Sequence, residues 1–274
     1  MSAGVARAGV RSASRGGKGR ELTARCGLTA RGVLYLLIAG VAARVALGDT
    51  AQEADRQGAL KELSGQPFGG VLVGAVGVGL VCMALWRLSE AVFGAAGADG
   101  GKATKRLASA ARTVFYGTAA YSVLSFAAGA GSGPSSDEQS RDVTTKALGL
   151  PAGQWLVGAA GAGILVAGVV IGVKAARRSF RKHMEMGGVS AGLRKTVDVL
   201  GVGGGMARGL VFATAGGFAV YAAVRYDPAQ VKGMDDTLRS FTGTPAGPWL
   251  LLAVAAGLAL FGLFSFAMAR WRKV

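Results

Sequence analysis

The segment Ala30-Arg31-Gly32-Val33-Leu34-Tyr35 places an arginine and an aromatic residue at the start of an apolar run. The pattern returns in a looser form as Ala111-Arg112-Thr113-Val114-Phe115-Tyr116 and as Ala207-Arg208-Gly209-Leu210-Val211-Phe212. Each copy is followed by an apolar segment, a charged connector, a proline and a second apolar segment. The prolines, which lie 36, 39 and 37 residues after their arginines, are Pro67, Pro151 and Pro245. Self-similarity at a nearly fixed period indicates an internal repeat, so the sequence predicts three tandem copies of a two-helix unit.

The apolar residues are gathered in blocks that suit membrane helices. Of the 274 residues, 51% are hydrophobic, and a helix that crosses the bilayer core needs roughly 20 apolar residues. Six blocks come close to this length: 32–47, 68–88, 114–131, 155–173, 209–226 and 249–269. The first is short and holds Arg44 near one end, where a long side chain can reach the headgroups. The sequence therefore predicts an all-α membrane protein with six transmembrane helices.

The net charge of +16 is distributed as membrane topology requires. Of the 31 Lys and Arg residues, 23 lie in the segments 1–31, 87–112, 174–208 and 270–274. Ten of the 15 acidic residues lie in or beside the other connectors. Because Lys and Arg are retained on the cytoplasmic side, we expect a protein of the cytoplasmic (plasma) membrane with both termini inside. Nucleic-acid binding is not expected, since no aromatic residues interleave the basic runs.

The chain divides into a tail and three repeats. Residues 1–20 are rich in Gly, Ser and Arg and predict a disordered basic cytoplasmic tail held near anionic lipid. The repeats are expected at 21–100, 101–190 and 191–274. Each outer connector has apolar residues at helical spacing, which predicts a short amphipathic helix. These residues are Leu60 and Leu63; Val143, Ala147 and Leu150; and Met234, Leu238 and Phe241.

Glycines four residues apart within the blocks suit close contact between two helices. Such pairs also arise by chance in a chain with 46 glycines, and both explanations stay open here. The pairs are Gly70/Gly74, Gly168/Gly172 and Gly205/Gly209.

Three stretches of the chain resemble a family of bacterial membrane proteins. They are Ala24-Arg25-Cys26-Gly27-Leu28-Thr29-Ala30-Arg31-Gly32-Val33-Leu34-Tyr35 and, downstream, Gln66-Pro67-Phe68-Gly69 and Ala84-Leu85-Trp86-Arg87. The family is domain-of-unknown-function family 1206, which is common in actinobacteria. The resemblance implies three repeats of two membrane helices over about residues 21–272. The second repeat departs from the pattern with Thr113, and the third with Ala246-Gly247 after its proline. The family supplies no activity to carry over.

Arg31, Arg112 and Arg208 are expected to begin equivalent helices on the same face. Around a pseudo-threefold axis they would form a cationic ring at the inner mouth. Such a ring suits an anion or a lipid headgroup, because arginine binds phosphate and carboxylate through a planar fork. The alternative is that each arginine anchors its helix at the membrane interface, and the sequence favours this alternative.

The blocks lack the groups that most chemistry needs. None contains Asp, Glu, Asn or His, which ion-coupled transporters carry at membrane depth. Glu90 follows Arg87 by three residues and predicts a local ion pair. His183 is the one histidine, so we expect no metal site, no cofactor and no catalytic set.

We therefore expect a non-enzymatic structural or accessory protein. Its basic inner face would bind anionic lipid or an acidic protein partner. The alternative is a pore or facilitator for a small neutral or anionic solute.

Overall fold

The computed structural model describes residues 3–48, 53–94, 101–129, 135–243 and 246–272. The described residues form α-helices joined by turns and short 3₁₀ helices. The α-helices are α1 (Ala3–Ala46), α2 (Arg56–Ser64), α3 (Gly69–Phe93), α4 (Ala103–Ala127), α5 (Ser136–Leu148), α6 (Gly153–Ala176), α7 (Ala191–Arg225), α8 (Met234–Ser240) and α9 (Gly247–Trp271). The 3₁₀ helices are η1 (Ser179–His183), η2 (Pro228–Gln230) and η3 (Phe241–Gly243).

Each repeat consists of a long helix, a short connector helix and a second long helix. Five helices in the described part of the chain are long and apolar enough to cross a membrane, and they are α1 (from Gly19), α3, α6, α7 and α9. The remaining long helix, α4, has 25 residues but is interrupted by Ser, Thr, Tyr and Arg side chains, which lower its hydropathy. The expected all-helical architecture with membrane-type helices is thus confirmed.

The helix starts differ from the sequence pattern. The first long helix, α1, begins at Ala3 and so includes residues 3–20 of the expected basic tail. The three repeat arginines lie inside α1, α4 and α7 rather than at their beginnings, and no proline precedes them within these helices. The arginines therefore project from the middle of continuous helices.

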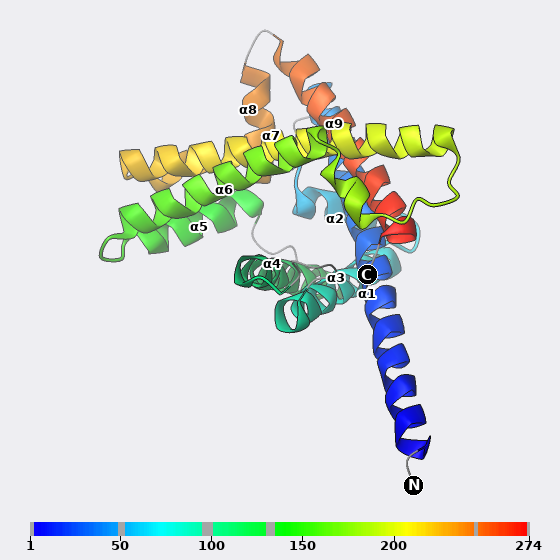
Figure 1. Ribbon diagram of the computed structural model, residues 1–274. Helices are drawn as coiled ribbons and strands as arrows, with labels where there is room; N and C mark the ends of the chain where they lie inside the picture. The colour runs from blue at the N-terminus through cyan, green and yellow to red at the C-terminus, as the bar shows by residue number, and fades with distance from the viewer. Residues whose placement is uncertain (1–2, 49–52, 95–100, 130–134, 244–245, 273–274) are drawn as a thin grey trace.

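The long helices pair in a cyclic order. The first helix of each repeat packs along the second helix of the preceding repeat, as α4 with α3 and α7 with α6. The ring closes through α1, which packs along α9 of the third repeat. Figure 1 shows the three pairs running in different directions, with α6 and α7 side by side across the view and α1 and α9 steeply inclined. This order is that of a pseudo-threefold arrangement.

Glycines allow the paired helices to approach closely. A Cβ atom on Gly209 of α7 would lie 2.8 Å from the carbonyl oxygen of Gly168 on α6. In the pair α1–α9, a Cβ atom on Gly32 would lie 3.0 Å from the carbonyl oxygen of Gly262. Gly32 and Gly209 both follow a repeat arginine directly, so the two pairs use the same contact twice.

The expected glycine pairs are confirmed in two cases. The backbones of Gly168 and Gly172 in α6 lie against Gly209 of α7, and Gly205 contacts Ala175. The third pair was wrong, because a Cβ atom on Gly70 or Gly74 would meet no other atom within 4 Å. Both lie at the start of α3, on a face that no described helix covers.

The connector helices lie as expected in the first and third repeats. Leu60 and Leu63 of α2 and Leu238 of α8 are buried. In α5 the expected apolar face was wrong, because Val143 is 60% exposed and Leu148 is buried instead. Here the hydroxyl of Tyr226, the residue that follows α7, donates a hydrogen bond to the carbonyl of Leu148, which fixes the other side of α5 against the long helices.

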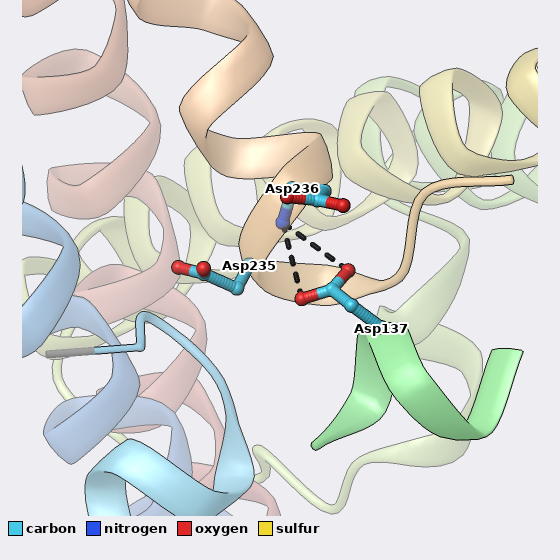
Figure 2. Close-up of side chains that lie close together, drawn as sticks. All are labelled: Asp137, Asp235 and Asp236. Atoms are coloured by element: carbon cyan, nitrogen blue, oxygen red, sulfur yellow. Dashed lines mark hydrogen bonds between the residues drawn. The ribbon is translucent and has the colours of Figure 1, made fainter. Parts of the chain in front are cut away.

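Aspartates tie the three connectors together. Asp55 of the first repeat accepts hydrogen bonds from the backbone N–H and the hydroxyl of Ser136 in the second, at 2.9 and 2.7 Å. Asp235 of the third repeat accepts one from the backbone N–H of Ala54 in the first, at 2.7 Å. Asp137 accepts from the backbone N–H of Asp236, at 3.3 and 3.4 Å (Figure 2). The connectors thus follow the same cyclic order as the helices.

Asp137 makes this end of the molecule sensitive to pH. Burial raises the pKa of its carboxyl from 3.8 to about 6, and the negative charge of Asp236 adds to the shift. A carboxyl whose pKa is raised in the folded state stabilises the fold when protonated. This contribution is complete below about pH 4 and is lost as the pH rises through about 6.

Replacing Asp137 by asparagine is therefore expected to raise the thermal midpoint at pH 7.5 and to leave it nearly unchanged at pH 4. The asparagine oxygen can still accept the hydrogen bond from Asp236. Thermal unfolding in a mild detergent at both pH values measures the effect. The control is Asp142→Asn, which removes an exposed carboxylate of the same helix. A lower midpoint at pH 7.5 for Asp137→Asn would contradict the prediction.

Candidate functional site

Arg31 is buried between α1 and α9, with 6% of its surface exposed. Its Nε donates a hydrogen bond to the hydroxyl of Ser265 at 3.2 Å, and a terminal nitrogen lies 3.9 Å from the sulfur of Met268. Its guanidinium carbon lies 5.1 Å from the ring centre of Phe261, within the range of a cation–π contact. An interface anchor would be exposed near a helix end, and Arg31 has neither property.

Arg208 approaches the same aromatic ring from α7. Its guanidinium carbon lies 4.9 Å from the centre of Phe261, 5.1 Å from Phe212 and 6.0 Å from Tyr35. The ring of Phe261 therefore contacts the guanidinium groups of both Arg31 and Arg208. Arg31 and Arg208 thus share one aromatic ring. Among the described residues, no carboxylate lies between the two guanidinium groups.

Arg112 completes the set from α4. It lies within electrostatic reach of Arg208 and Arg87, whose positive charges also act on Arg31. Unlike Arg31, Arg112 is exposed. The structure thus brings the three sequence-predicted arginines into one region, with Arg112 on its open side.

The tyrosines near these arginines follow the repeat order. Arg31 of the first repeat lies within electrostatic reach of Tyr116 in the second. The guanidinium carbon of Arg208 in the third repeat lies 6.0 Å from the ring centre of Tyr35 in the first. Each tyrosine lies four residues after the arginine of its own repeat. The corresponding residue in the third repeat is Phe212, which has no hydroxyl to offer Arg112.

Two more arginines belong to this region. Arg87 of α3 is buried and donates to the carboxylate of Glu90 at 2.6 Å, which confirms the expected ion pair. Its guanidinium carbon lies 4.2 Å from the ring centre of Trp86, and that of Arg272 lies 4.7 Å from the same ring. The sequence carries a signal for both, because each directly follows a tryptophan near the end of a repeat. Neither was expected as a site residue.

These five residues form what we call the arginine cluster: Arg31, Arg87, Arg112, Arg208 and Arg272. Among the described residues, the carboxylate that contacts it is Glu90, which also accepts a hydrogen bond from Ser109 at 3.3 Å. The buried Nε atoms of Arg87, Arg208 and Arg272 find no hydrogen-bond partner in the described part of the chain. Buried charges and donors are costly unless paired, so the cluster has donors to spare for an anion.

Two other features of the structure have charged groups close together. Asp137, Asp235 and Asp236 each place a carboxylate oxygen within 4.8 Å of the others (Figure 2). Asp137 and Asp235 accept backbone hydrogen bonds from neighbouring connectors, and Asp236 pairs with Arg141 at 2.5 Å. These carboxylates are occupied in holding the fold.

A shallow basic groove lies between η1 and α7. It has a volume of about 720 Å³ and is lined by Arg178, Arg181, Arg194 and Lys195. The carboxylate of Asp198 lies in this groove and is held by Arg181. The groove is open, and Asp198 neutralises part of its charge. In the arginine cluster, by contrast, Arg31 and Arg87 are buried, and five cations share one carboxylate.

Three helical repeats, membrane-type helices and a buried arginine cluster define a polytopic membrane protein of the repeat class. The profile of the family described as Domain of Unknown Function (DUF1206) matches residues 26–94, 107–178 and 203–272. The chain belongs to this family, and the expected family and its three repeats are confirmed.

A curated relative has the same extent. It is "Uncharacterized protein YxxB" of Bacillus subtilis (strain 168), which is 28% identical over 243 residues, or 88% of this chain and 87% of the relative. No solved structure matches the chain. The relative's name supplies no activity.

Proposed function

We propose that this is a six-span protein of the plasma membrane that binds the phosphate of an anionic lipid at its arginine cluster. Both termini face the cytoplasm, and α4 supplies the sixth span. The single observation that carries the proposal is the imbalance of the cluster, in which five guanidinium groups face one carboxylate. Arginine forks match phosphate oxygens in geometry as well as charge.

The orientation rests on charge. The arginine cluster lies toward the ends of the repeats that carry most Lys and Arg, and these ends are retained in the cytoplasm. Anionic phospholipids attract basic segments at that surface. An even number of spans places both termini on this side, and α4 is long enough, with 25 residues, to be the sixth.

The role is binding rather than catalysis. The cluster has guanidinium groups, aromatic rings and hydroxyls but no nucleophile activated by a base among its described members. A structural or accessory protein uses such a site to hold a lipid or to sense it. An acidic protein segment would compete for the same guanidinium groups.

The test is a lipid-binding measurement on the purified protein in a neutral detergent. Phosphatidylglycerol is expected to bind more tightly than phosphatidylcholine in native mass spectrometry. Replacing Arg31, Arg112 and Arg208 together by glutamine is expected to weaken phosphatidylglycerol binding at least about tenfold, since each charged hydrogen bond contributes roughly 1.5–3 kcal/mol. Inorganic phosphate, tested alone, separates a headgroup site from a site for the free anion.

The matched control changes the same charge outside the cluster. Lys174, Arg177 and Lys182 are exposed on the same basic end of the chain, and their replacement by glutamine is expected to leave binding nearly unchanged. Equal loss in both triple variants would mean that general basic charge binds the lipid. Equal binding of phosphatidylcholine would also overturn the proposal. Circular dichroism confirms that each variant is folded.

A further inference from the structure

The first and second helices of a repeat cross at one small contact, which occurs twice in the structure. In the first repeat, a Cβ atom on Gly79 of α3 would lie 2.3 Å from the Cβ of Ala30 on α1. In the third repeat, a Cβ atom on Gly257 of α9 would lie 2.3 Å from the Cβ of Ala207 on α7. Ala30 and Ala207 each directly precede a repeat arginine. The crossing therefore lies directly beside the position from which the arginine side chain projects.

The second repeat has the residues for the same crossing but does not make it. Ala111 directly precedes Arg112, and Gly163 lies ten residues after Gly153, the first residue of α6, as Gly79 lies ten after Gly69. A Cβ atom on Gly163 would nevertheless meet no other atom within 4 Å. The helices α4 and α6, all of whose residues are described, do not pack on each other. One of three equivalent interfaces is open.

The open interface leads to the arginine cluster. Arg112, which follows Ala111 at the open crossing, is exposed, whereas Arg31, at the equivalent position of a closed crossing, is 6% exposed. The helices on either side expose apolar residues, including Val114 and Phe115 of α4 and Ile164 and Val166 of α6. An apolar seam that ends at a cation matches the shape of an anionic lipid, with acyl chains along the helices and phosphate at Arg112.

We propose that α4 and α6 form a lateral gate to the arginine cluster. In this structure the gate is open, since α4 and α6 are apart. In the closed state Ala111 packs on Gly163 as Ala30 packs on Gly79, and Arg112 is enclosed. The lipid enters sideways from the bilayer through the open seam, a role that rests on the lipid binding proposed above.

The helix that closes the gate belongs to the same chain. α4 and α6 are consecutive long helices joined through α5, whose Asp137 and Leu148 are tied to the third repeat. Arg112 already lies within electrostatic reach of Arg208 on α7, the helix that packs along α6. A swing of the α3–α4 pair toward α6 therefore suffices.

The experiment is a disulfide across the gate. Ala111→Cys and Gly163→Cys are combined in a variant whose free cysteines are removed by Cys26→Ser and Cys82→Ala. Oxidation in native membranes is expected to join the two cysteines within one chain, since a disulfide needs Cα atoms about 4.4–6.8 Å apart. Peptide mass spectrometry after oxidation identifies the bond. The control pair is Ala111→Cys with Gly172→Cys, which lies farther along α6 and is expected to join much less.

The second readout is lipid exchange. The oxidised protein is expected to take up phosphatidylglycerol from vesicles at least about tenfold more slowly than the reduced protein, because the entrance is locked. A bond between two chains, or none above the control, would overturn the gate. Unchanged uptake in the locked protein would also overturn it while leaving the binding site in place. If the disulfide forms but the reduced protein binds no phosphatidylglycerol, the lipid role fails and the closure stands.

Discussion

Replacing Arg87 by methionine is expected to lower the free energy of unfolding by about 3–5 kcal/mol. The change leaves the carboxylate of Glu90 buried, with the hydroxyl of Ser109 as its remaining described side-chain partner. Removing one member of a buried ion pair costs this much because the other charge loses its hydrogen-bonded partner, and Arg112 and Arg272 act on Glu90 only through space. Reversible unfolding in mixed micelles, followed by circular dichroism, measures the loss.

The double variant separates this explanation from simple loss of packing. Arg87→Met combined with Glu90→Leu removes both charges and is expected to restore most of the lost stability. The control is Lys146→Met, which breaks the exposed pair with Asp142 and is expected to change stability by less than about 1 kcal/mol. A double variant no more stable than Arg87→Met would show that the arginine, rather than the uncompensated carboxylate, carries the effect.

Replacing Gly168 by leucine is expected to lower the free energy of unfolding by about 3 kcal/mol, the upper part of the usual range for overpacking. A Cβ atom there would lie 2.4 Å from the backbone nitrogen of Ala213 and 2.7 Å from the carbonyl oxygen of Gly209. Backbone atoms cannot turn aside as a side chain can, so α6 and α7 must separate. Unfolding in mixed micelles provides the measurement.

Gly172→Leu is the matched control in the same helix. A Cβ atom on Gly172 would meet no other atom within 4 Å. Both variants exchange glycine for a better helix former, so this intrinsic gain is the same in each. If the two substitutions changed stability equally, close packing at Gly168 would not be the reason.

The sequence predicts the parts of this fold better than their arrangement. The repeated arginine and proline positions indicate three two-helix units, and the Arg87–Glu90 pair follows from a spacing of three residues on one helix. Which helices pair does not follow, because the apolar face of α1 suits α3 and α9 equally well. That choice depends on contacts between residues 230 positions apart, such as Gly32 with Gly262.

The sequence predicts only part of the arginine cluster, because it does not determine which helices pack together. Repetition within the chain singles out Arg31, Arg112 and Arg208, since each occupies the same place in its unit. Arg87 and Arg272 come from the second helices, whose neighbours the sequence leaves undetermined. The burial of Arg31 was likewise beyond the sequence, because it depends on Ser265 and Met268 of the last helix.

The pairing of α1 with α9 has a consequence for biosynthesis. About 200 residues separate the end of α1 from the beginning of α9, which corresponds to roughly 10–40 s of translation. During this time α1 is in the membrane without the helix along which it finally packs, and Arg31 is without Ser265 and Phe261. The first helix to be made is therefore among the last to reach its final contacts, and a nascent chain at this stage depends on lipid or an insertion factor to shield that face.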